Sequence, residues 1–109
     1  MAEAFKNAYL DVTSSAQTLY TAPASTSSIM ITLRITNVDG ATDDTITADV
    51  VDSSSGNSRI AYTISVPADS TIELAGTSKI ILEAGDYVQL TGGNASGDLE
   101  AYASIVEIT

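Results

Sequence analysis

The sequence predicts an all-β fold, an antiparallel two-sheet sandwich or jelly-roll-like domain of about eight or nine strands. Two observations lead to this prediction. From Ser28 to Thr109, short runs alternate apolar and polar side chains, and many of the apolar residues are β-branched. Turn-forming residues separate these runs roughly every 8–12 residues, as is typical of sandwiches and barrels. We therefore expect residues 1–109 to form one β-sandwich domain, with a less regular segment over 1–28.

The clearest predicted strand covers residues 29–36. Its alternation places four aliphatic residues on one face, namely Ile29, Ile31, Leu33 and Ile35. Met30 falls on the opposite, nominally polar face, although a β-bulge would change this assignment. A helix would need apolar spacings of three and four, which this run lacks.

Two further strands are predicted over residues 45–52 and 59–66. The first directs Ile46, Ala48 and Val50 inward. The second directs inward Ile60, Tyr62, Ile64 and Val66. The loops 37–44 and 52–58 are rich in Asp, Asn, Ser and Gly, which suit tight turns. We expect each loop to join neighbouring strands as a hairpin.

The remaining strands are shorter, apart from the last. Pro67 ends the preceding strand because proline cannot donate to a strand ladder, and Ala84-Gly85 forms a tight turn. The other predicted strands are 8–12, 18–21, 70–75, 79–83, 86–91 and 99–108. A helix over 2–10 is the alternative for the N-terminal segment, since its residues accept a helix.

The last predicted strand is apolar on both faces. Leu99, Ala101, Ala103 and Ile105 share one face, whereas Tyr102, Val106 and Ile108 share the other. Such a strand is either central and covered by its own domain, or it meets another subunit. The candidate interface residues are Met30, Val38, Tyr102, Val106 and Ile108.

The composition argues against an enzyme. The chain contains no His and no Cys, the residues on which catalysis near neutral pH and metal binding most often depend. We predict no catalytic residue, no cofactor and no metal site. The acidic loop Asp39–Asp44 could bind Ca²⁺ through several oxygens, but it lacks the ordered spacing of a calcium loop, which favours a simple turn.

The charge limits the partners. Fourteen acidic residues against four basic ones give a formal net charge of −10, which opposes contact with phosphates and anionic lipids. We therefore expect neither nucleic acid nor membrane as a partner. The N-terminal sequence has no signal-peptide pattern, so we expect synthesis in the cytoplasm.

Several segments resemble small β-sandwich virion proteins of tailed bacteriophages. They are the opening Leu19-Tyr20-Thr21-Ala22-Pro23-Ala24, the segment Ser65–Ser70, the strand-turn-strand segment Lys79–Leu90 and the closing Ala101–Ile108. The resemblance extends over nearly the whole chain from about Tyr9, but its motifs are short and also occur in unrelated jelly rolls.

The resemblance implies a non-enzymatic capsid decoration (cement) protein located in the virion. Its partners would be copies of itself in a homo-oligomer, for which a trimer is one option, and the major capsid or other virion proteins. The alternative is a tail, fibre or neck module that recognises a host-surface glycan through its Ser-, Asn- and Gly-rich loops. A third reading, a cupin-like enzyme, would need a metal held by carboxylates alone, because the metal-binding histidines of cupins are absent.

Overall fold

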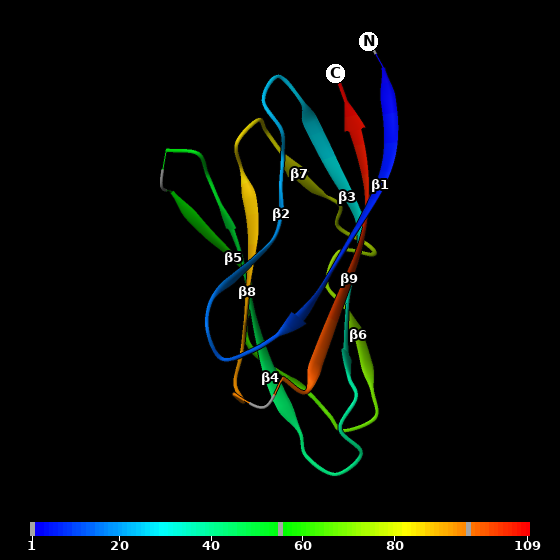
Figure 1. The fold of residues 1–109 in the computed structure, drawn as a ribbon, viewed down its shortest axis with the longest axis vertical. Helices are drawn as coiled ribbons and strands as arrows, with labels where there is room; N and C mark the ends of the chain where they lie inside the picture. The colour runs from blue at the N-terminus through cyan, green and yellow to red at the C-terminus, as the bar shows by residue number, and fades with distance from the viewer. Residues whose placement is uncertain (1, 55, 96) are drawn as a thin grey trace.

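The computed structural model describes residues 2–54, 56–95 and 97–109. Its described residues form two antiparallel sheets packed face to face (Figure 1), so the predicted all-β sandwich is confirmed. The nine strands are β1 (Glu3–Val12), β2 (Gln17–Thr21), β3 (Ser27–Asn37), β4 (Asp44–Val51), β5 (Asn57–Val66), β6 (Thr71–Glu73), β7 (Ile80–Leu82), β8 (Tyr87–Gly92) and β9 (Leu99–Ile108). The alternative of a helix over residues 2–10 is wrong, because β1 occupies this segment.

The two sheets differ in size. The five-stranded sheet has the order β1-β9-β3-β6, and β7 pairs with another stretch of β3. The four-stranded sheet has the order β2-β8-β4-β5. The first and last strands are neighbours, so the two chain ends lie side by side (Figure 1). Because most neighbouring strands come from distant parts of the sequence, most residue contacts are long-range.

The core lies between the two sheets, where the apolar faces of the strands meet. Its buried residues are Val12, Leu19, Ala22, Met30, Leu33, Ile35, Ile46, Ala48, Ala61, Val66, Ala75, Ile80, Leu82, Val88, Leu90, Leu99, Ala101, Ala103 and Ile105. The alternation predicted for the last strand is present, and the face that carries Leu99, Ala101, Ala103 and Ile105 is the one buried in this cluster. The strand is also central, between β1 and β3.

A β-bulge in β3 changes one predicted face. Met30 pairs with Ile105 and Thr32 pairs with Ser104, so Ile31 is an extra residue. Alternation therefore changes phase: Met30 is buried, whereas Ile29 and Ile31 are only half-buried. Their predicted inward position is wrong, because the bulge shifts the pleat by one residue.

Strand β5 also departs from its predicted pattern. Two register shifts interrupt its pairing with β4, and Thr63 adopts a positive φ of 46°. Tyr62 and Ile64 are consequently 61% and 44% exposed, although both were expected to point inward. Val66 is buried as predicted, and Pro67 directly follows the end of the strand.

The loop between β3 and β4 is a crossover between the sheets, so the predicted hairpin at 37–44 is wrong. Buried Asn37 holds this crossover: its Nδ2 donates hydrogen bonds of 2.9 Å to the carbonyl groups of Thr42 and Val66. The 52–58 loop does join a hairpin, since β4 pairs with β5, although Ser55 lies outside the described residues. The tight turn at Ala84-Gly85 is also present, with Gly85 at a φ of 89°.

Candidate protein interaction face

The outer face of the five-stranded sheet carries an apolar row across four strands. Phe5 of β1 is the cross-strand partner of Val106 in β9, and Val106 is in turn the partner of Ile29 in β3. Ile29 is the partner of Ile81 in β7. Cross-strand partners on one face lie within side-chain contact distance, so the four side chains form a continuous row. Phe5 and Ile81, at its two ends, are 80% and 60% exposed.

A second row runs beside the first. Tyr9 of β1 is the cross-strand partner of Tyr102 in β9, and Tyr102 is in turn the partner of Arg34 in β3. Arg34 is the partner of Glu73 in β6. Tyr9 is 77% exposed and Tyr102 is 39% exposed. We call these two rows, together with Ile31, the outer face of the five-stranded sheet.

Glu73 closes a gap at the edge of this sheet. Strands β6 and β7 pair with different stretches of β3. Between these stretches the Leu33 carbonyl accepts a hydrogen bond from the Leu74 amide at 2.8 Å, and the Leu33 amide bonds to a side chain instead. Glu73 Oε2 accepts hydrogen bonds from the amide groups of Leu33 at 2.7 Å and Ala75 at 3.0 Å. The carboxylate therefore replaces a missing strand neighbour and fixes the end of the second row.

Tyr102 stands between two shallow hollows on the outer face. A hollow of about 530 Å³ is lined by residues that include Phe5, Ile31 and Ser104, and a hollow of about 370 Å³ by Tyr9, Arg34 and others. Tyr102 lines both. A face that is broad, shallow and aromatic suits contact with another protein surface.

The structure brings together three of the five predicted interface residues. Tyr102, Val106 and Ile108 lie along the outer face of β9, with Val106 and Ile108 half-buried. Met30 was expected on this face but is buried in the core, because of the bulge at Ile31. Val38 is 54% exposed, but it lies in the loop beyond the end of β3 and apart from the two rows.

Sequence reasoning missed Phe5, Tyr9 and Ile81 as members of this face. Phe5 and Tyr9 lie four residues apart in β1 and therefore share one face of the strand. Val12, which is buried, belongs to the opposite face. That alternation could have shown a strand with an aromatic outer side. The pairing of β1 with β9 joins opposite ends of the chain, however, and no local signal reveals it.

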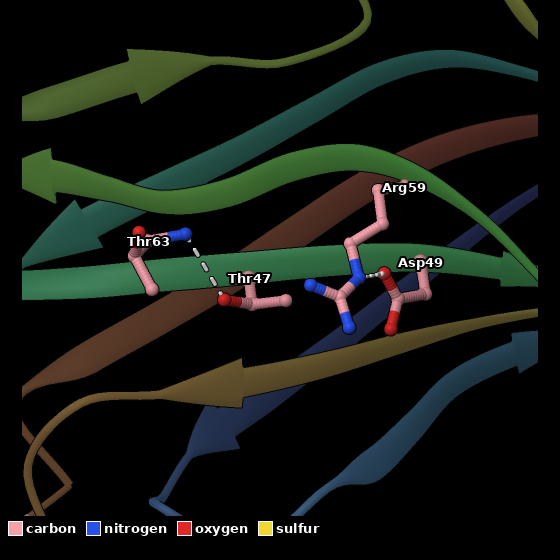
Figure 2. A network of polar contacts seen from close by, with 4 residues as sticks. All are labelled: Thr47, Asp49, Arg59 and Thr63. Carbon is pink, nitrogen blue, oxygen red and sulfur yellow. Dashed lines mark hydrogen bonds and ion pairs between the residues drawn. The ribbon is translucent and has the colours of Figure 1, made fainter.

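The outer face of the four-stranded sheet is different, because polar contacts occupy it. Arg59 Nε lies 3.3 Å from Asp49 Oδ1 on the neighbouring strand, and the Thr63 amide donates to Thr47 Oγ1 at 3.1 Å (Figure 2). The Arg59 guanidinium also lies 4.2 Å from the centre of the Tyr62 ring. The exposed large apolar side chains of this sheet are Tyr62 and Ile64, whereas the five-stranded sheet exposes Phe5, Tyr9, Ile81 and Tyr102.

The aspartates at the two ends of the Asp39–Asp44 loop accept hydrogen bonds from backbone amides, both nearby in the chain and in the loop that follows β8. The Asp39 carboxylate accepts hydrogen bonds from the amides of Ala41 and Thr42, and Asp44 Oδ1 accepts from the amides of Thr45, Gly93 and Asn94. These contacts describe a turn held by its aspartates. Within 2–54, 56–95 and 97–109, no group of three or more His, Cys, Asp or Glu side chains is placed to hold a metal ion.

The described part of the chain contains no helix with the length and hydropathy needed to cross a membrane. Comparison with family models, curated proteins and solved structures finds no match to this chain. The functional interpretation therefore depends on the surface described above.

Proposed function

We propose that this protein is a non-enzymatic structural protein of a tailed-phage virion, a capsid decoration protein that works as a homo-oligomer. The observation that carries the proposal is the apolar row Phe5–Val106–Ile29–Ile81, which extends across four strands without a covering element among the described residues. Large exposed apolar patches on water-soluble domains mark surfaces that bind other proteins. The phage assignment itself comes from the sequence resemblance.

The mechanism is burial of surface between neighbouring subunits. A protein that binds only the assembled shell stabilises that assembly by mass action, and no bond needs to be made or broken. The outer face of the five-stranded sheet would supply the apolar contact. The net charge of −10 favours a shell surface with basic side chains, because complementary charge steers association and selects the partner.

The test measures binding to purified empty shells, from the source of this sequence, that lack the protein. We expect the protein to co-sediment with the shells and to raise their melting temperature. Ile81→Lys and Tyr102→Lys place a charge on the outer face at exposed positions and should abolish co-sedimentation. Thr18→Lys, at an exposed position of the four-stranded sheet, is the matched control and should bind as the unmodified protein does.

Failure to bind shells under all salt conditions would contradict the decoration role. Binding to host cells instead, with shells unaffected, would support the alternative of a tail or fibre module that recognises a surface glycan. The Ser-, Asn- and Gly-rich loops would carry that activity; Ser55 and Ser96, which belong to them, lie outside the described residues.

A further inference from the structure

The sandwich leaves one long, regular strand edge open. Strands β6 and β7 have three residues each, and β2 has five residues and a register shift. Edge strand β5 has two register shifts and the positive φ of Thr63. Short strands and bulges protect sheet edges from pairing with other chains. Strand β1 has neither protection: it runs for ten residues in unbroken register with β9.

The hydrogen-bonding pattern shows which residues face the open edge of β1. Ala2 and Thr109 exchange both of their backbone hydrogen bonds, which makes them a hydrogen-bonded pair. Such pairs alternate along an antiparallel ladder, so the even-numbered residues of β1 bond to β9. The amide and carbonyl groups of the odd-numbered residues, from Glu3 to Asp11, therefore point toward the open edge.

These odd-numbered residues include the most exposed large apolar side chains among the described residues. Phe5 is 80% exposed and Tyr9 is 77% exposed. They lie two residues on either side of Asn7. A two-fold axis through Asn7 would therefore place Phe5 of each copy opposite Tyr9 of the other, and would repeat this aromatic pair.

Other antiparallel registers are less favourable. An axis at Lys6 would place two ammonium groups at the closest pair in the ladder, where like charges repel. An axis at Ala8 would set Phe5 against Asp11 and leave Tyr9 against Asn7. The axis at Asn7 pairs the whole strand, avoids the lysine contact, and has only the Glu3–Asp11 repulsion at the exposed ends of the ladder.

We propose that β1 pairs antiparallel with β1 of a second copy about a two-fold axis at Asn7, so that two five-stranded sheets become one continuous sheet. This inference rests on the proposed homo-oligomer and names the strand that forms it. Backbone hydrogen bonds from the odd-numbered residues and two Phe5–Tyr9 cross-strand pairs would join the copies, while the outer sides of the four rings stay on the sheet surface.

The pairing also extends the outer face. The row that ends at Phe5 in one copy continues into Tyr9 and Tyr102 of the second copy. The dimer would then present a single apolar face twice as wide as that of one chain. A wider face suits a protein that spans neighbouring subunits of a lattice.

The absence of cysteine from the chain makes a sharp test possible. Asn7→Cys would place two thiols opposite each other at the axis, with Cα atoms about 5.5 Å apart, a spacing that a disulfide accepts. We expect this variant to form a covalent dimer under mild oxidation at least about tenfold faster than Ser58→Cys, an exposed control on edge strand β5.

The register has its own control. Glu3→Cys and Asp11→Cys should each dimerise slowly alone but rapidly when the two variants are mixed, because residues 3 and 11 are opposite each other. Replacing both Phe5 and Tyr9 by Ser should weaken the dimer by about 100-fold in sedimentation experiments, since two aromatic pairs are lost. Both side chains are exposed, so the fold should remain intact.

A monomer at high protein concentration, with Asn7→Cys no faster than Ser58→Cys, would overturn the proposed pairing. Rapid cross-linking of Glu3→Cys alone, or of the Ser58→Cys control, would also overturn it. Shell binding is measured separately. A monomer that binds shells would refute the strand pairing and the homo-oligomer but leave the decoration role standing, whereas a cross-linked dimer that does not bind shells would refute only the decoration role.

Discussion

The Tyr20 hydroxyl group donates a 2.5 Å hydrogen bond to Glu107 Oε2, and this contact joins β2 of one sheet to β9 of the other. The same hydroxyl group lies 2.8 Å from Ser28 Oγ on β3. The three residues therefore tie the two sheets together near the end of the sandwich where the chain termini lie. The contact gives the stability of the fold a specific pH dependence.

Unfolding measurements at alkaline pH should reveal this contact. Burial, followed by the hydrogen bond to Glu107, raises the pKa of Tyr20 from 10.0 to about 12. Because the folded state holds the phenolic proton more tightly, this contribution is complete below pH 10 and is lost as the pH rises through 12. Solvent screening of this half-buried group limits the effect to about 1 kcal/mol.

The Tyr20→Phe variant should lose this pH dependence. Its free energy of unfolding should be lower by about 1 kcal/mol near pH 8, and the difference from the unmodified protein should vanish toward pH 12. Tyr62→Phe, on exposed strand β5, is the control and leaves the Tyr20 contact in place. An unchanged difference between pH 8 and 12 would contradict the assignment.

Alanine substitutions test the bulge in β3. Met30→Ala should lower the free energy of unfolding by about 2–4 kcal/mol, because Met30 is buried and its removal leaves a cavity. Ile31→Ala should cost less than about 1 kcal/mol, since Ile31 is half-buried on the outer face. Urea unfolding of the two variants measures both values. The opposite order would mean that the strand alternates without a bulge.

Asn37 is predicted to be essential for the crossover between the sheets. Its side chain donates to two carbonyl groups and accepts a 2.9 Å hydrogen bond from the Asp39 amide. Asn37→Ala should lower the free energy of unfolding by about 2–3 kcal/mol, because it leaves buried backbone groups unpaired. The exposed Asn57→Ala is the matched control in the same urea experiment. Equal values for the two variants would exclude this role.

The Arg59–Asp49 ion pair should stabilise the edge of the four-stranded sheet (Figure 2). Asp49 is only 8% exposed, whereas the Arg59 side chain is 52% exposed. Arg59→Ala should therefore cost about 1–2 kcal/mol, between the values for a surface pair and a buried pair. A double-mutant cycle with Asp49→Asn measures the coupling. A coupling energy of zero would show that the contact contributes nothing.

The strand pattern was readable from the sequence because alternation is a local property. Each predicted strand has a counterpart, and the buried side of β9 follows its alternation without error. The sequence does not show which side of β3 points into the core at its start. Ile29, Met30 and Ile31 are all apolar, so either alternate set of residues would suit a core. Only the pairing of β3 with β9 decides between them.

The candidate face was readable in part for the same reason. Tyr102, Val106 and Ile108 stand out within one strand, whereas Phe5 and Ile81 join them only through pairing with β9 and β3. Bulges in β5 likewise depend on pairing with β4, so the exposure of Tyr62 has no local signal. Contacts between distant segments determine which strands are neighbours and where bulges occur, and alternation within one strand does not reveal either.

The most direct test of the central claim is the copy number of this protein in purified particles from its source, measured by quantitative mass spectrometry. A decoration protein that covers a repeating shell should be present in copy numbers on the order of hundreds, because shell sites repeat by symmetry. Particles that assemble and contain no copies would contradict the proposed structural role.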